Sequence, residues 1–266
     1  MRVLVTRPSR EAQSWLQALK TAGHNPVALP LIDIVSVPDL RALHRQWLQI
    51  ARYQAVMFVS ANAVDFFFAD KPSSVGSIFS QGELAIRAWT TGPGTARALM
   101  RLGASAASID TPKSESLQFD SESLWSVVRD QVKAGCNILI VRGEEAQAEL
   151  TQSAEGSGRD WLAQRVCEAG GSVDFLVVYR RQVPSFVPAQ QDMVRSSAAD
   201  GSVWLFSSSQ AIANLVGSFP SLSWTQSRAV ATHPRIAQTA RSHGFGVVCE
   251  SRPTLDDVVA SIESMA

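Results

Sequence analysis

The stretch "TGPGTARALMRLG" (91–103) has a second version in the other half of the chain, "THPRIAQTARSHG" (232–244). Four residue types recur in the same columns: Thr91 with Thr232, Pro93 with Pro234, Ala96 with Ala237, and Gly103 with Gly244. Each version follows a short apolar run that is typical of a buried strand. Because proline favours the first turn of a helix and glycine the position after its end, each version predicts a strand followed by a helix.

The duplication extends beyond this junction. "FVSANAV" (58–64) matches "FSSSQAI" (206–212), and "VLVTRP" (3–8) resembles "ILIVRG" (138–143). Apolar runs alternate with amphipathic segments along the chain, a pattern that predicts parallel sheets with crossover helices. Each half therefore holds the same parts, although their order is rotated because one strand–helix pair opens the chain.

The predicted fold is α/β, with two similar parallel-sheet domains. One domain is discontinuous and comprises residues 1–36 and 174–266, and the other is inserted as residues 37–173. Two long extended segments, 27–37 and 172–181, are then the only crossings. They predict a two-stranded connector and a cleft between the domains.

Composition narrows the possible partners. The chain has 266 residues, of which 24 are basic and 24 acidic, so its formal net charge is zero. This balance argues against bulk electrostatic binding to nucleic acid or to an anionic membrane. We find no signal peptide, no run of about 18 apolar residues and no heptad pattern, and we expect a monomer that does not enter a membrane.

Cysteine and histidine usage indicates the compartment. Cys136, Cys167 and Cys249 are widely spaced, and the four histidines show no metal-ligand spacing. We therefore expect reduced thiols in a cytoplasmic protein, with no metal site.

Candidate binding residues lie where strands end. In open parallel sheets, ligands bind outside the carboxyl ends of the strands, where helix N-termini present free N–H groups. Ser60, Ser208, the Thr91–Gly92 pair and the Thr232–His233 pair occupy such junctions. Several of them around one cleft would suit a ligand with many carboxylates. The alternative is that these residues only cap helices and preserve the fold.

Two further patterns bear on the ligand and the chemistry. "TGPGTAR" (91–97) resembles part of a dinucleotide fingerprint, but Arg97 occupies the column of its third glycine, which argues against that cofactor. Tyr179 is one of only two tyrosines and ends a long apolar strand at the predicted crossing. We expect its hydroxyl to open toward the cleft as a proton donor that is neutral at pH 7. The alternative is a core aromatic residue whose tip alone is hydrated.

Taken in order, the motifs resemble the uroporphyrinogen-III synthase family. They cover essentially the whole chain: "VLVTRP" (3–8), "FVSANAV" (58–64), "TGPGTARAL" (91–99), "FDSESLW" (119–125), "LIVRGEE" (139–145), "FLVVYRR" (175–181), "FSSSQAI" (206–212) and "PTLDDVVASI" (253–262). The resemblance implies a cofactor-independent lyase with two α/β domains. It implies conversion of hydroxymethylbilane, a linear tetrapyrrole, into uroporphyrinogen III with loss of water and inversion of the last pyrrole ring.

The resemblance also assigns roles to residues. It makes Tyr179 the candidate proton donor. It implies that the following residues bind the substrate: Ser60, Asn62, Gly92, Thr95, Gly143, Ser208, Thr232, His233 and Arg235. Arg7 and Arg142 each follow a strand and are expected to pair with substrate carboxylates, although an arginine in such a loop is commonly only solvated.

One turn departs from the family pattern, Gly-Pro-x-Thr-Ala. Residues 233–237 read His-Pro-Arg-Ile-Ala, so a threonine hydroxyl is missing, whereas 92–96 keep the pattern. Either Arg235 replaces a hydrogen bond with a charge, or the turn contributes only backbone N–H groups. Two alternatives to the synthase therefore stay open. One is a hinge-type protein that binds an anionic small molecule, and the other is an inactive family member.

Overall fold

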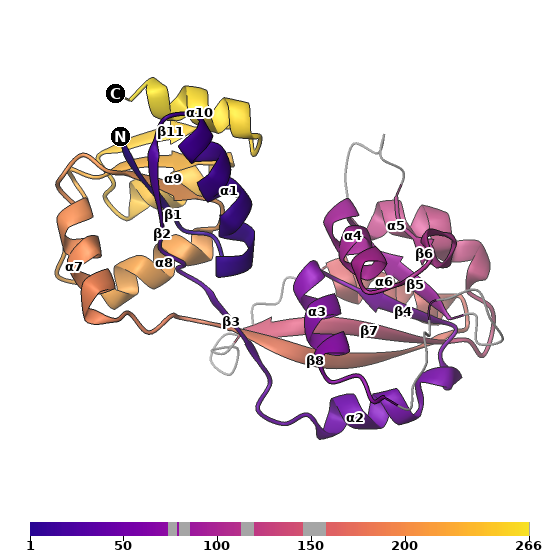
Figure 1. Cartoon of the computed structure of the whole chain (residues 1–266). Helices are drawn as coiled ribbons and strands as arrows, with labels where there is room; N and C mark the ends of the chain where they lie inside the picture. The colour runs from indigo at the N-terminus through magenta and orange to yellow at the C-terminus, as the bar shows by residue number, and fades with distance from the viewer. Residues whose placement is uncertain (74–78, 80–85, 113–119, 146–157, 266) are drawn as a thin grey trace. The chain divides into compact units, whose positions relative to one another are not determined.

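The computed structural model describes residues 1–73, 79, 86–112, 120–145 and 158–265, which form two compact units (Figure 1). Unit 1 comprises Met1–Asp33 and Gln182–Ala266, and unit 2 comprises Ile34–Arg181. Both are built from short apolar strands that alternate with helices, so the predicted α/β class with parallel sheets is confirmed.

Unit 1 contains a five-stranded sheet in the order β11-β10-β9-β1-β2, in which every neighbouring pair is parallel. Its strands are β1 (Arg2–Val5), β2 (Asn25–Ala28), β9 (Val203–Phe206), β10 (Arg228–Ala231) and β11 (Val247–Glu250). The central strand β9 is buried along its whole length because helices cover both faces of the sheet.

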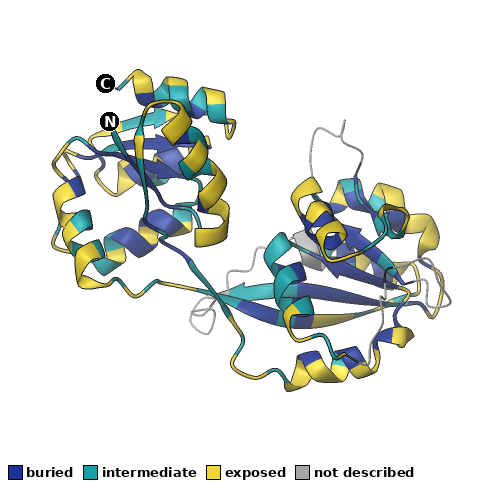
Figure 2. Ribbon diagram, viewed as in Figure 1, coloured by how far each residue is buried: buried dark blue, intermediate teal, exposed yellow. Residues whose placement is uncertain are grey.

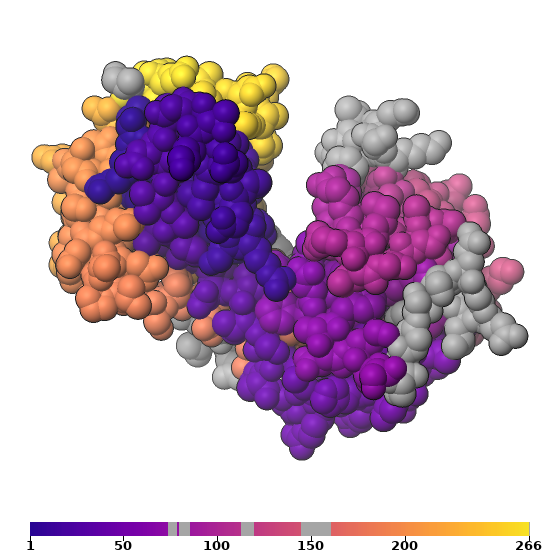
Figure 3. Space-filling model, in the orientation of Figure 1, coloured from indigo at the N-terminus to yellow at the C-terminus, as the bar shows by residue number. Residues whose placement is uncertain are grey.

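The helices of unit 1 are α1 (Ser9–Thr21), α7 (Pro188–Ser197), α8 (Ser209–Ser218), α9 (Pro234–Ser242) and α10 (Leu255–Glu263). Alternate residues of the strands, such as Val3, Val5 and Leu205, pack against α1 and α10 on one face. The space-filling view shows the N-terminal segment, in indigo, lying against the C-terminal helix, in yellow (Figure 3). The two ends of the chain thus complete one core.

Unit 2 contains a six-stranded sheet in the order β3-β8-β7-β4-β5-β6. Its strands are β3 (Asp33–Ser36), β4 (Ala55–Phe58), β5 (Arg87–Thr90), β6 (Ile109–Asp110), β7 (Asn137–Glu145) and β8 (Ser172–Gln182). The five strands from β8 to β6 are parallel. Figure 2 shows that central strands of both sheets, such as β4 and β9, are buried, whereas the edge strands β3 and β11 are partly exposed.

Helices cover both faces of this second sheet. They are α2 (Arg41–Leu48), α3 (Ala61–Ala69), α4 (Pro93–Arg101), α5 (Ser121–Val128) and α6 (Gly158–Glu168), with short 3-10 turns at Ile50–Arg52, Ala106–Ser108 and Arg129–Gln131. Side chains of α2, α3 and α4 form one core cluster with the sheet, and those of α5 and α6 form another on the opposite face.

The structure places the unit boundaries at Asp33/Ile34 and Arg181/Gln182, whereas the sequence pattern placed them at 36/37 and 173/174. The second boundary lies later because β8 stays paired with β7 as far as Glu145↔Arg181. The extended segment predicted over 27–37 is divided between β2 and β3, which belong to different sheets. The chain therefore crosses between the units at the start of β3 and the end of β8, and these two strands are neighbours.

Candidate active site

Ser60 stands at the carboxyl edge of the sheet in unit 2, directly after β4. Its backbone is extended, with φ −164° and ψ 164°, and its Oγ accepts a hydrogen bond of 3.2 Å from the backbone N–H of Ala63. Ser60 is therefore the N-cap of α3, as expected for a serine between a buried strand and a helix. Its side chain remains partly exposed.

Tyr179 is buried in the core, with only 1% of its surface exposed. Its hydroxyl was expected to open toward the cleft, but the residue is buried in the core of unit 2, which agrees with the alternative of a core aromatic residue. The ring stacks on Phe66 of α3, with the two ring centroids 5.8 Å apart. It belongs to the same core cluster as Leu176 and Val178.

A register shift between β7 and β8 explains this burial. The pairs run one to one from Asn137↔Ser172 to Arg142↔Val177, and then Gly143 pairs with Tyr179. Val178 is the extra residue, as in a β-bulge. Consecutive side chains of a regular strand point to opposite faces, but here Val178 and Tyr179 both enter the same cluster.

Gly143 makes room for the tyrosine ring. A Cβ atom at this position would lie 2.7 Å from Cδ2 of Tyr179 and closer still to Cε2 and Cζ. Real carbon atoms do not approach so closely, so a side chain at 143 and the ring in this position exclude each other. The family resemblance implied a role for Gly143 in substrate binding, whereas the structure shows it shaping the position of Tyr179.

Two of the described residues place polar atoms beside the Tyr179 hydroxyl. Ser60 Oγ lies 3.2 Å from Tyr179 Oη, and Nη2 of Arg181 donates to the same oxygen at 3.4 Å. The guanidinium carbon of Arg181 is also 5.8 Å from the centroid of the ring. The fold thus brings together two predicted site residues that are far apart in the sequence. Sequence reasoning missed Arg181, although its place two residues after Tyr179 in "YRR" was a usable signal.

The other predicted site residues of unit 2 differ in position and in exposure. Gly92 occupies the N-cap position of α4 after β5, the parallel neighbour of β4, so it shares the sheet edge with Ser60. Its N–H donates to Thr90 Oγ1 at 3.4 Å. Asn62 is partly exposed in the first turn of α3, whereas Thr95 is 7% exposed.

Arg142 lies on β7 just before the register shift. Its guanidinium carbon is 4.7 Å from the ring centroid of Phe175, and its side chain is partly exposed. Beyond the shift, Arg180 forms an ion pair with Glu144. Arg142, Glu144 and Arg180 thus lie in the carboxyl-terminal parts of β7 and β8, next to Gly143 and Tyr179 in the sequence.

In unit 1, Ser208 and Thr232 follow the neighbouring parallel strands β9 and β10. Ser208 holds the N-cap position of α8 but makes no capping hydrogen bond. Thr232 is 8% exposed, and its N–H donates to the carbonyl of Phe206 at 3.1 Å. These residues form the carboxyl edge of this sheet.

His233 caps α9 through its side chain. Nδ1 accepts a hydrogen bond of 3.1 Å from the backbone N–H of Arg235. The side chain of Arg235 itself is exposed. The turn that departs from the family pattern is thus capped by an imidazole, whereas Gly92 in the matching turn has no side chain to cap its helix, and one amide of the turn at 233–237 is already occupied.

Arg7 follows β1 and is mostly buried. Burial lowers the pKa of its guanidinium, and Glu11, 3.8 Å away, opposes this shift. The guanidinium carbon lies 4.8 Å from the ring centroid of Trp15. Its buried Nε has no hydrogen-bond partner within the described part of the chain, which makes Arg7 a suitable partner for an incoming carboxylate.

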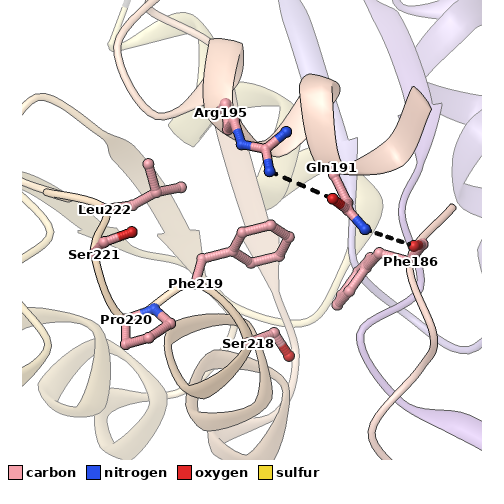
Figure 4. A pocket seen from close by; sticks show the side chains of 8 residues that line it. All are labelled: Phe186, Gln191, Arg195, Ser218, Phe219, Pro220, Ser221 and Leu222. Atoms are coloured by element: carbon pink, nitrogen blue, oxygen red, sulfur yellow. Dashed lines mark hydrogen bonds between the residues drawn. The ribbon is translucent and has the colours of Figure 1, made fainter. Parts of the chain in front are cut away.

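Two pockets lie away from these residues. A pocket of about 270 Å³ in unit 1 is lined by Phe186, Gln191, Arg195, Ser218, Phe219, Pro220, Ser221 and Leu222 (Figure 4). Figure 4 shows Arg195 held by Gln191, which in turn donates to the carbonyl of Phe186. The second pocket, of about 450 Å³, lies in unit 2 beside Ala55, Arg87 and Ile138, at the amino ends of the strands. Neither pocket contains a predicted site residue.

The described residues contain neither a metal-binding cluster nor a membrane-spanning helix. No group of three or more His, Cys, Asp and Glu side chains that could hold a metal ion occurs among them. Within the same residues, no helix is long and apolar enough to cross a membrane.

The fold and these residues define a class: α/β proteins of two parallel-sheet units whose candidate site residues follow the carboxyl ends of the strands. The family model for "Uroporphyrinogen-III synthase HemD" matches residues 13–260. The chain therefore belongs to the uroporphyrinogen-III synthase family.

Two curated relatives are similar over much of this chain. The porphyrin biosynthesis protein HemD of Ruminiclostridium josui is 21% identical over 260 residues, which are 97% of this chain and 47% of that protein. The chain thus spans about half the length of this relative. The uroporphyrinogen-III synthase of Chlorobaculum parvum is 25% identical over 204 residues, which are 75% of this chain and 70% of that protein.

Solved structures of the family share the fold. The uroporphyrinogen-III synthetase of Helicobacter pylori matches with a TM-score of 0.57 at 14% identity, over 100% of both chains. A mutant uroporphyrinogen III synthase of Thermus thermophilus matches with a TM-score of 0.53 at 16% identity, over 100% of this chain and 98% of the other.

Proposed function

We propose that this protein converts hydroxymethylbilane into uroporphyrinogen III and acts as a lyase that needs no cofactor. The terminal hydroxyl of the bilane leaves as water, and the resulting azafulvene cation is attacked to form a spirocyclic intermediate. This intermediate reopens with the last pyrrole ring inverted, and the macrocycle closes. Membership of the family supports the reaction, and the hydrogen-bonded pair of Ser60 and Tyr179 supports the chemistry.

That pair is the observation that carries the proposal. Loss of a hydroxyl as water requires a proton, and a positioned donor contributes about 10²- to 10⁴-fold to the rate of such a step. Tyr179 and Ser60 supply hydroxyl protons at the carboxyl edge of a parallel sheet, where ligands of such folds bind. Arg7 and Arg142 are the candidate partners of substrate carboxylates.

Control of the product isomer requires only a modest difference in free energy between two transition states. The free bilane also closes without inversion, and limiting that route to about 1% requires about 2.7 kcal/mol between the two transition states. Contacts that hold the bilane folded supply such a difference by fixing the approach of the reacting carbons. The proposal includes a cytoplasmic monomer, consistent with the free cysteines among the described residues and with the balanced charge.

A coupled assay tests the proposal. Porphobilinogen is converted to hydroxymethylbilane by a separate deaminase in the presence of the protein, and the oxidised products are separated by isomer. Type III product is the expected result, and type I product alone would refute the activity. A protein that only binds the bilane would slow closure without changing the isomer.

A further inference from the structure

The exposure of Ser60 and that of Tyr179 differ in a way that bears on proton transfer. Tyr179 is 1% exposed and lies beneath Phe66 and beside Gly143, whereas the Ser60 side chain is partly exposed at the end of α3. A group that protonates a substrate must come within hydrogen-bond distance of it. Ser60 is exposed enough to contact a substrate, whereas Tyr179 is buried and contacts Ser60.

The hydrogen bonds around Ser60 leave one donor free. A hydroxyl carries one hydrogen and two lone pairs. One lone pair accepts the Ala63 N–H at 3.2 Å, and the other faces Tyr179 Oη at 3.2 Å. If Tyr179 donates to Ser60, both lone pairs of Ser60 are occupied, and its own hydrogen is available for another acceptor.

Arg181 sets the direction of the bond between the two hydroxyls. A guanidinium can only donate, so its bond of 3.4 Å to Tyr179 Oη uses a lone pair of the phenol. Because a guanidinium cannot accept, Ser60 is the one of these two neighbours that can accept the phenolic hydrogen. The Arg181 cation thus lies beside the phenolic oxygen, and Ser60 lies at the N-terminus of α3.

We propose that Ser60 is the residue that protonates the substrate, and that Tyr179 resupplies Ser60 with a proton. As the C–O bond of the terminal hydroxymethyl group breaks, the Ser60 proton moves to the departing oxygen, which leaves as water. The Tyr179 proton moves to Ser60 Oγ, and the phenolate stays beside Arg181. The proton lost by the pyrrole carbon at ring closure returns through Ser60 to Tyr179. This relay rests on the proposed function.

A double-mutant cycle tests the relay in the coupled assay. Ser60→Ala and Tyr179→Phe are each expected to lower kcat about 100-fold with KM within twofold of wild type. The double variant is expected to be no slower than the slower single variant, because both changes interrupt the same path. Ser60→Thr keeps a hydroxyl and is expected to retain kcat within about fivefold of wild type.

Capping must be separated from proton transfer, since Ser60→Ala also removes the N-cap of α3. Asp120 is the matched control, because it caps α5 in the same unit by accepting from the Ser123 N–H at 2.8 Å. Asp120→Ala removes a comparable capping bond and is expected to leave kcat unchanged.

A spectroscopic measurement tests the hydrogen bond without the reaction. The chain has only two tyrosines, so tyrosine labelled with ¹³C at Cζ gives two signals, and Tyr53→Phe assigns them. Ser60→Ala is expected to shift the Tyr179 signal, whereas Asp120→Ala is not. An unshifted signal, a fast Ser60→Ala enzyme or single effects that multiply in the double variant would each overturn the relay while type III activity stands. A wild-type chain that forms only type I product would overturn both proposals.

Discussion

Gly143 and Tyr179 face each other across β7 and β8, and the tyrosine ring occupies the space that a side chain at 143 would need. The absence of a side chain on one strand thus permits the ring on the next strand to take this position. Gly143 is therefore a positioning residue for Tyr179 in the mechanism proposed above.

Replacing Gly143 with alanine should displace this ring. We expect Gly143→Ala to lower type III formation at least as much as Tyr179→Phe and to cost about 1–3 kcal/mol of stability through overpacking. The coupled assay and urea unfolding measure the two effects. The double variant Gly143→Ala/Tyr179→Val, which relieves the overlap, is expected to recover stability but not activity. A fully active Gly143→Ala enzyme would contradict this role.

Asp120 gives α5 a pH-dependent cap. The bond from the Ser123 N–H lowers the pKa of the Asp120 carboxyl, so the folded state binds its proton more weakly than the unfolded state does. The stabilisation is therefore present above about pH 4, the ordinary carboxyl value, and is lost as the pH falls through the lowered folded-state pKa. Asp120→Asn keeps a capping oxygen without a titration.

Hydrogen exchange of residues 121–128 as a function of pH measures this effect. Wild type should lose protection on acidification more steeply than Asp120→Asn. Equal slopes for the two proteins would show that the carboxylate contributes no pH dependence there.

His233 should stabilise α9 through its capping bond. We expect His233→Ala to cost about 0.5–2 kcal/mol and His233→Asn only a few tenths, because asparagine is also a good N-cap. Hydrogen exchange of residues 234–242 reports the local change. Ser208→Ala is the control in the same unit, since Ser208 makes no capping bond to α8 and its loss should matter less. Equal losses at both sites would argue against a cap at His233.

Gly246 should tolerate no side chain. A Cβ atom there would lie 2.8 Å from the carbonyl carbon of Thr225 and closer to its oxygen, and backbone cannot rotate away as a side chain can. We expect Gly246→Ala to destabilise unit 1 by about 1–3 kcal/mol. Gly217→Ala in α8, where no atom lies within 4 Å of the new carbon, should be neutral or stabilising by up to about 1 kcal/mol. Thermal unfolding of both variants provides the comparison.

The local elements were predictable because their causes are local. Apolar runs indicated the strands around Val56 and Leu205, and prolines 93 and 234 correctly marked the first helical residues of α4 and α9. Ser60 follows a buried strand and caps the next helix, a relation contained within a few neighbouring residues. The duplication of these junctions was sufficient to indicate two α/β units.

The neighbours of Tyr179 could not be predicted in the same way. Its face on β8 depends on a one-residue shift against β7, and register is set by pairing between segments far apart in the chain. Read as a regular strand, "FLVVYRR" places Val178 and Tyr179 on opposite faces. The structure places both in one cluster, so the tyrosine is buried where an open hydroxyl was expected.

The sequence alone thus determined the alternation of strands and helices, the two related halves and the residues that begin each helix, because short-range sterics and hydrogen bonding decide all three. By contrast, the space that Gly143 leaves for the ring, the contact of Ser60 with Tyr179 and the place of β8 in unit 2 follow only from the folded chain. These three features depend on strand register and on packing between segments that are far apart in the sequence, so no single segment specifies them.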